Sequence, residues 1–281
     1  MKNLYYYGFI ILEYLLNILP NILLNLLKNM LANLFYYISK KRRNIVYKNL
    51  ELMTGKKDKI LAKKAFYNFF DNIFDILKSY KFTKEDLKNK IEFKNLDQVK
   101  ELLNETPVIF VTAHYSNWEI LPLGVGAFVA PLDVTVRKID SDKLDKKIKE
   151  HRERFGIRIY DRKYGLKYLI KSLKSGRSIG LLLDQYPGDD KGIVTRFFSH
   201  PVRHLDIAAI LSKKFNIPIV MSFIDKKDDK YIIEFVDVFN TDDIQKSVDR
   251  QAEVTEEYIK AHGIEKWYLF HRRFRPWEKY E

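Results

Sequence analysis

Residues 107–113 (PVIFVTA), followed at once by residues 114–119 (HYSNWE), decide the fold class of this chain. The first seven form a short apolar run rich in β-branched side chains, which is typical of a buried strand. The six that follow are polar and aromatic, and a helical pattern begins among them at Asn117 and continues to Phe128. A buried strand that leads directly into a helix indicates an α/β fold.

The same alternation continues to the C-terminus. Further strands are expected at 132–137, 178–183, 217–223 and 231–238, with helical patterns at 141–155, 165–174, 205–215 and 245–262. This order predicts a mostly parallel central sheet flanked by helices, with an antiparallel hairpin across 225–230. We divide the chain into an N-terminal helical segment, 1–40, and one domain, 41–281, which is helical over 41–100 and α/β over 101–281.

The first forty residues form an unusual helical segment. Apolar side chains recur at steps of three and four from Leu15 to Ile38, and asparagines at 17, 21, 25, 29 and 33 form a second stripe. Pro20 is expected to kink or divide the helix. Glu13, Lys28 and the asparagines interrupt any run of about 20 apolar residues, so a standard membrane span is not expected. A cleavable signal peptide is not expected either, because the apolar run is long and lacks a small-residue cleavage site.

Two interpretations of this segment remain open. It contacts a membrane with its apolar face, or it is buried against the protein's own core. Residues 40–43 (KKRR) favour membrane contact, because basic residues beside an apolar segment indicate a cytoplasmic side that faces anionic headgroups.

Composition restricts the possible functions. The chain of 281 residues has a formal net charge of +13, which favours anionic partners such as lipid headgroups, phosphorylated substrates or nucleic acid. No block of five Lys or Arg residues and no zinc-finger or RNP1-type motif is present, so nucleic acid is not the expected partner. The chain has no cysteine, which excludes disulfides, thiolate catalysis and cysteine-ligated metals.

His114 and Glu119 are the candidate catalytic pair. Sites in α/β sheets gather where strands end and helices begin, and His114 directly follows the expected strand. A carboxylate that accepts one ring N–H fixes the imidazole tautomer and makes the other nitrogen a general base. Glu119, five residues later, is expected to supply that carboxylate. Alternatively, Glu119 only stabilises the start of the helix and His114 is unrelated to it.

Two other motifs are weaker candidates. Residues 176–180 (GRSIG) match the G-x-S-x-G motif of serine hydrolases, but that motif needs a strand before the serine and a helix after it, whereas here the order is reversed. His200 and His204 are four residues apart, as two ligands on one helix face would be. Pro201 is expected to open that helix and leave His200 outside it, and no acidic third ligand lies near, so no metal site is expected.

Several blocks of the sequence resemble one enzyme family. HYSNWE (114–119) is similar to the H-x4-D/E signature of glycerolipid and lysophospholipid acyltransferases, and further blocks resemble the bacterial lipid A late acyltransferases, the lauroyl and myristoyl transferases. These blocks are VR at 136–137, YDRK at 160–163 with SLKSG at 172–176, LDQYPG at 183–188 with FF at 197–198, and WYLFHRRFRP at 267–276. Arg42-Arg43 and Asn49-Leu50 match a basic cluster and an N-L pair of the same family. Leu183 departs from the family pattern, where many members have proline.

The resemblance implies a function and a set of site residues. It implies an acyltransferase on the cytoplasmic face of the bacterial inner membrane, which moves an acyl chain from acyl-carrier protein to a hydroxyl of an anionic glycolipid, a lipid A precursor. No cofactor is implied. His114 is the implied base and Glu119 orients it. The implied substrate-binding residues are Asn117, Arg137, Arg162, Asp184 and Gln185. The alternatives are an acyltransferase for another glycolipid or lysophospholipid, and a non-enzymatic basic protein that binds membranes.

Overall fold

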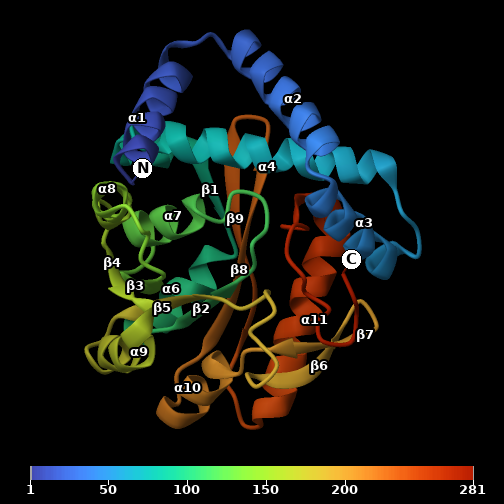
Figure 1. The fold of residues 1–281 in the computed structure, drawn as a ribbon. Helices are drawn as coiled ribbons and strands as arrows, with labels where there is room; N and C mark the ends of the chain where they lie inside the picture. Colours follow the sequence, from blue (N-terminus) through green and yellow to red (C-terminus); the bar gives the residue numbers. More distant parts are fainter. Residues whose placement is uncertain (1, 281) are drawn as a thin grey trace.

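The computed structural model describes residues 2–280, and side chains from Tyr6 onward; Met1, part of the predicted 1–40 segment, lies outside the described residues. A seven-stranded sheet forms its centre (Figure 1), with the strand order β1-β9-β8-β2-β5-β3-β4. The strands are β1 (Ile91–Lys94), β2 (Ile109–Thr112), β3 (Leu132–Val136), β4 (Ile157–Asp161), β5 (Ser178–Leu182), β8 (Ile219–Lys227) and β9 (Lys230–Phe239). Neighbouring strands run parallel except β8 and β9, which form an antiparallel hairpin. The predicted fold class is therefore confirmed.

Helices cover both faces of the sheet. The α-helices of the described residues, of which α1 and α2 lie outside these layers, are α1 (Lys2–Ile18), α2 (Asn21–Ile38), α3 (Lys40–Thr54), α4 (Lys59–Ser79), α5 (Lys84–Lys90), α6 (Leu96–Glu105), α7 (Ile120–Phe128), α8 (Asp142–Glu153), α9 (Gly165–Lys174), α10 (Ile207–Phe215) and α11 (Ile244–His262). Side chains alternate across β2, so Ile109 and Val111 join the core that contains α9, α10 and α11, while Phe110 joins the core that contains α6 and α7. Both faces of β2 are thus buried, which explains its continuous apolar run.

Four strands were not predicted from the sequence. β1 and β4 are the two edge strands of the sheet, and exposed polar residues such as Glu92 and Arg158 interrupt their apolar pattern. β1 also shows that the region 41–100, predicted to be helical, contributes a strand. β6 (Ile193–Phe197) and β7 (His200–His204) form a separate antiparallel hairpin, so the helix expected to open at Pro201 is wrong.

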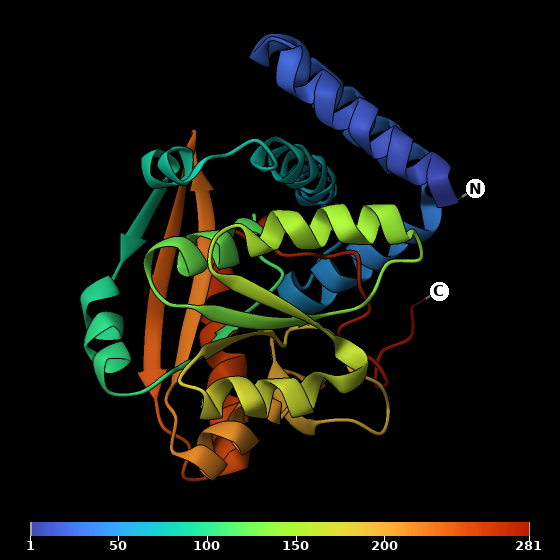
Figure 2. The same ribbon diagram turned by 90° about the vertical axis from the view of Figure 1, so that its left-hand side faces the viewer.

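The N-terminal segment consists of two helices that break at Pro20, as predicted. Figure 1 shows α1 and α2 rising above α4 as the two arms of an inverted V, and Figure 2 shows them along one edge of the molecule. Leu16 of α1 and Leu24 of α2 are buried with Phe74 and Leu77 of α4, so one face of the segment packs on the domain. Within the described residues, none of the helices has the length and apolar character needed to cross a membrane.

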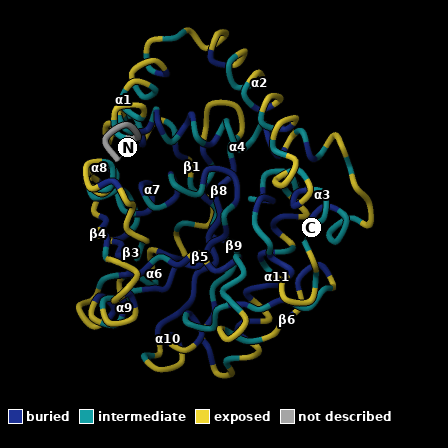
Figure 3. Tube along the Cα trace, viewed as in Figure 1, coloured by how far each residue is buried: buried dark blue, intermediate teal, exposed yellow. Residues whose placement is uncertain are grey.

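The other face of α1 and α2 is exposed (Figure 3). Of the twenty large apolar side chains that are exposed in the described part of the chain, twelve lie on these two helices, including Ile22, Leu26 and Met30 at 75%, 62% and 58% exposure. The asparagine stripe is also exposed from Asn21 to Asn33, and Asn29 and Asn33 each donate a hydrogen bond to the carbonyl four residues back. A concentration of exposed apolar surface on one element is typical of an interaction site.

Candidate active site

The carboxyl ends of β2 and β5 meet at the centre of the sheet. The two strands are parallel neighbours with Thr112 opposite Leu182. His114 and Asp184 each lie two residues beyond that pair, so the register brings them together. The Nδ1 atom of His114 lies 2.7 Å from Oδ1 of Asp184, and the backbone N–H of His114 donates to Oδ2 at 3.0 Å.

Asp184 is a buried, ionised carboxylate. The residue is 3% exposed, and Trp267 donates a third hydrogen bond from Nε1 to Oδ2 at 2.8 Å. Burial alone would raise the pKa of Asp184, but the imidazole charge and the hydrogen bond of His114 outweigh it and hold the pKa below its ordinary value. Because an ionised carboxylate only accepts hydrogen bonds, Nδ1 of His114 carries the hydrogen and Nε2 is left as the basic nitrogen.

The pKa of His114 is shifted in the opposite direction. Burial alone would lower the pKa of His114, but the charge of Asp184, its hydrogen bond and the more weakly acting charge of Glu119 raise the pKa above the ordinary value of 6.5. The imidazole is therefore a stronger base than a free histidine. The rings of Trp118 and Tyr268 lie beside it, with centroid distances of 5.2 and 6.2 Å.

Glu119 does not make the predicted hydrogen bond to His114. Its Oε2 accepts two bonds from Arg152 of α8, from Nε at 3.0 Å and from an Nη at 2.5 Å. The turn between His114 and Glu119 passes through a left-handed conformation at Ser116 (φ 46°), and α7 begins immediately after Glu119. The carboxylate that is hydrogen-bonded to the His114 ring belongs instead to Asp184, after the neighbouring strand β5. Asp184 was predicted to bind substrate, and in the structure its carboxylate contacts His114 and Trp267.

Asn117 supports the turn and does not line the cavity. It is fully buried, and its Nδ2 donates to Asp75 of α4 at 2.8 Å. Asn72, also on α4, donates to the carbonyl of Ser116 at 2.7 Å. Lys226 of β8 bridges Asp75 and Asp71 at 2.6 and 2.9 Å. Asn117 was predicted to bind substrate, and in the structure its amide N–H holds the His114 turn against α4.

A cavity of about 610 Å³ opens beside His114, a size that accommodates a small-molecule ligand. His114, Trp118 and Glu119 line its polar part, together with Arg152. Its walls are largely apolar and come from the cores on both faces of the sheet. They include Phe110, Leu121, Leu132, Val134, Ile157 and Leu181. This arrangement combines one basic nitrogen with a space suited to a hydrocarbon chain.

Three of the predicted substrate-binding residues line this cavity. Arg137 follows β3, Arg162 follows β4, and Gln185 follows Asp184 after β5. The sheet thus brings together side chains from three strand ends, as expected for this class of fold. Sequence reasoning missed Arg152, Trp267 and Tyr268. The tail 267–276 was singled out by its resemblance, but no local pattern indicated that it returns to the β2 end.

The weaker motifs have structural roles. Ser178 is 2% exposed at the start of β5, and its Oγ accepts the backbone N–H of Val108 at 3.1 Å. His200 and His204 lie on β7, and buried His204 is hydrogen-bonded to Arg273 through Nδ1 at 3.1 Å. In the part of the chain that the structure describes, no three His, Asp or Glu residues are placed to hold a metal ion.

Comparison with known proteins identifies the family. Residues 2–276 match the family model described as bacterial lipid A biosynthesis acyltransferase. No curated protein sequence matches significantly. Among solved structures, the 1-acyl-sn-glycerophosphate acyltransferase PlsC of Thermotoga maritima is similar at 14% identity and a TM-score of 0.43, covering 85% of this chain and 99% of that one. Because the family model spans nearly every residue, the chain belongs to the bacterial lipid A biosynthesis acyltransferases and is an acyltransferase of lipid metabolism.

Proposed function

We propose that the protein transfers a fatty acyl chain from the thioester of an acyl-carrier protein to a hydroxyl group of a lipid A precursor. The observation that carries this proposal is the His114–Asp184 pair at the mouth of a largely apolar cavity. The pair supplies a base of raised pKa, and the cavity supplies room for an acyl chain. Family membership supports acyl transfer to a lipid.

The reaction proceeds by general base catalysis. Nε2 of His114 accepts the proton of the acceptor hydroxyl while that oxygen attacks the thioester carbonyl. A C–O bond forms, and a tetrahedral oxyanion results. When the C–S bond breaks, the imidazolium returns its proton to the leaving sulfur. Asp184 holds the ring in the required tautomer and stabilises the imidazolium between these two steps.

The arginines of the cavity suit the charged parts of this reaction. Arg137 and Arg162 are the proposed donors to the oxyanion or to a substrate phosphate. Arg152 is neutralised by Glu119, so this pair shapes the cavity next to His114 and adds no net charge. A single well-placed donor to an oxyanion typically contributes about 2.7–4 kcal/mol to the transition state.

The exposed face of α1 and α2 is the proposed membrane contact. Its apolar side chains suit insertion into the interface of a bilayer, and Lys40 and Lys41 at its end suit anionic headgroups. A lipid acceptor is available only at a membrane, and an acyl-carrier protein is available only in the cytoplasm. We therefore propose that the enzyme works on the cytoplasmic face of the bacterial inner membrane.

Acyl transfer by the purified protein tests the proposal. The protein in detergent is incubated with an acylated carrier protein and a lipid A precursor, and the molecular mass of the lipid is then measured by mass spectrometry. A mass gain of one acyl chain that depends on His114 is expected. Transfer to a lysophospholipid but not to the lipid A precursor would show that the proposed acceptor is wrong. Absence of transfer to every lipid with a free hydroxyl would contradict the proposed reaction.

A further inference from the structure

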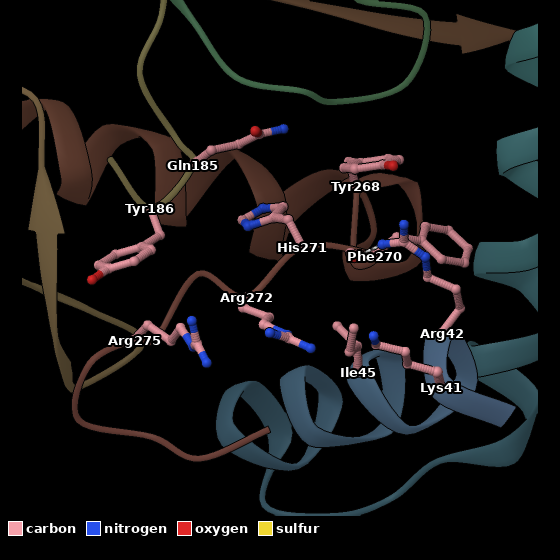
Figure 4. Close-up of a pocket in the computed structure, with 10 residues that line it drawn as sticks. All are labelled: Lys41, Arg42, Ile45, Gln185, Tyr186, Tyr268, Phe270, His271, Arg272 and Arg275. Atoms are coloured by element: carbon pink, nitrogen blue, oxygen red, sulfur yellow. Dashed lines mark hydrogen bonds between the residues drawn. The ribbon is translucent and has the colours of Figure 1, made fainter. Parts of the chain in front are cut away.

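A second depression lies next to the catalytic cavity and has no part in the chemistry described above. Its volume is about 560 Å³, and it lies between the start of α3 and the C-terminal segment that follows α11. Figure 4 shows Arg272 and Arg275 extending from the C-terminal segment and Lys41 extending from α3 toward Arg272. Arg42 completes the set and donates to the carbonyl of Phe270 at 3.0 Å.

The charge of this depression is not balanced. Four of its ten lining residues are Lys or Arg and none is acidic. No ion pair with any described residue is made by Lys41, Arg272 or Arg275. By contrast, Arg152 and Lys226 near the His114 turn are paired with carboxylates. Like charges held close together repel one another, so an anionic ligand would stabilise the cluster.

His271 provides a second, independent sign of a ligand. It lines the depression, and both of its ring nitrogens are buried without a hydrogen-bond partner in the described structure. A buried polar atom without a partner costs about 1–3 kcal/mol and calls for an explanation. Burial lowers the pKa of His271 to about 3, so the ring is neutral and has one N–H to donate.

The depression adjoins the cavity beside His114. Gln185 and Tyr186, which directly follow Asp184 in the chain, line both spaces. Tyr268 lines the depression and also lies beside the His114 and Trp118 rings. A ligand in the depression would therefore lie next to residues that also line the cavity of His114.

We propose that Lys41, Arg42, Arg272 and Arg275, with His271 behind them, form a subsite for a phosphate group of the acceptor lipid. This inference rests on the proposed function, because it assigns the phosphate to the molecule that is acylated. Arginine forks bind phosphate with paired, charge-assisted hydrogen bonds. The subsite anchors the acceptor by its charged end and leaves a hydroxyl of the same molecule next to His114.

Binding without turnover tests the subsite separately from the reaction. His114→Ala protein is titrated in detergent micelles with a phosphorylated lipid A precursor and with the same lipid after phosphatase treatment. We expect the phosphorylated lipid to bind at least about tenfold more tightly, and Arg272→Gln/Arg275→Gln to abolish the difference, since each charge-assisted bond to phosphate typically contributes a factor of about ten or more. Equal affinity for the two lipids would contradict the subsite even if acyl transfer is found.

A matched variant controls for net charge. Arg158→Gln/Arg196→Gln removes two exposed arginines that line neither cavity, and it is expected to leave the preference for phosphate unchanged. In the active protein, Arg272→Gln/Arg275→Gln is expected to raise KM for the acceptor at least about tenfold and to leave KM for the acyl donor within about twofold. A rise in KM for the acyl donor alone would assign the cluster to donor binding and overturn the proposal.

Discussion

Oδ1 of Asp184 lies 2.7 Å from Nδ1 of His114, and its other carboxylate oxygen accepts the backbone N–H of the same histidine, although the two residues are 70 positions apart in the chain. Two bonds to one residue fix both the backbone and the ring. The imidazole therefore has one orientation before substrate arrives, which is the preorganisation that a general base requires.

The first prediction concerns His114, the proposed base, and its effect on kcat. His114→Ala is expected to lower kcat by about 10²–10⁴-fold, the usual contribution of a positioned acid–base group. Asp184 keeps its bonds to the backbone and to Trp267, so the variant is expected to fold and to bind lipid. Steady-state kinetics with circular dichroism as the folding control provide the measurement. Activity within about threefold of wild type would contradict a role for His114 as the base.

The ion pairs beneath the His114 turn are expected to support stability. Lys226 has 22% side-chain exposure and bridges Asp71 and Asp75, while Asp71 also pairs with Lys28 of α2 at 2.6 Å. Lys226→Ala leaves two neighbouring carboxylates without their shared cation, so the free energy of unfolding is expected to fall by about 3–5 kcal/mol. Lys227→Ala, at the next and exposed position, is expected to change it by less than about 0.5 kcal/mol. Urea unfolding of both variants provides the test. Equal changes in the free energy of unfolding would show that the ion pairs of Lys226 do not stabilise the protein.

The exposed face of α2 is expected to hold the protein on membranes. Leu26→Glu/Met30→Glu should lower binding to anionic vesicles by more than tenfold, because each large apolar side chain that enters the bilayer contributes about 1.5–3 kcal/mol. Val194→Glu/Ile210→Glu adds the same charge at exposed apolar positions elsewhere and should leave binding nearly unchanged. Vesicle sedimentation measures both. Equal loss in the two variants would point to charge repulsion in place of membrane insertion by α2.

Point variants are preferable here to a truncation. Deleting residues 1–38 would uncover Phe74 and Leu77 of α4, which pack against Leu16 and Leu24. The structure shows that it would create a new apolar surface on α4, which would confuse loss of membrane contact with loss of packing.

The central strands could be predicted because burial on both faces gives them continuous apolar runs. β2 and β5 were recognised in this way, and His114 was placed correctly at the end of β2. The edge strands β1 and β4 were missed, since their exposed faces interrupt the apolar pattern with residues such as Glu92 and Arg158. Local periodicity therefore reports burial, and it is weakest at the edges of a sheet.

The partner of His114 could not be assigned from local spacing. Glu119 is the carboxylate nearest to His114 in the chain, but its side chain accepts hydrogen bonds from Arg152, which lies 33 positions further on in α8. Asp184 becomes the partner only because β5 lies beside β2 with Thr112 opposite Leu182. That adjacency is a property of the strand order, which no single segment of the sequence contains.

The pH dependence of kcat/KM in Asp184→Asn and Glu119→Gln tests the central claim most directly. The proposed mechanism uses neutral His114, so kcat/KM is expected to rise with pH through the pKa of His114. Burial lowers that pKa, but Asp184 chiefly raises it above 6.5. Asp184→Asn removes that effect, so the rise should move to lower pH while the maximal rate falls. Glu119→Gln, whichever rate it has, should move the rise far less. A larger shift in Glu119→Gln than in Asp184→Asn would contradict the assignment of Asp184 as the residue that orients the catalytic base.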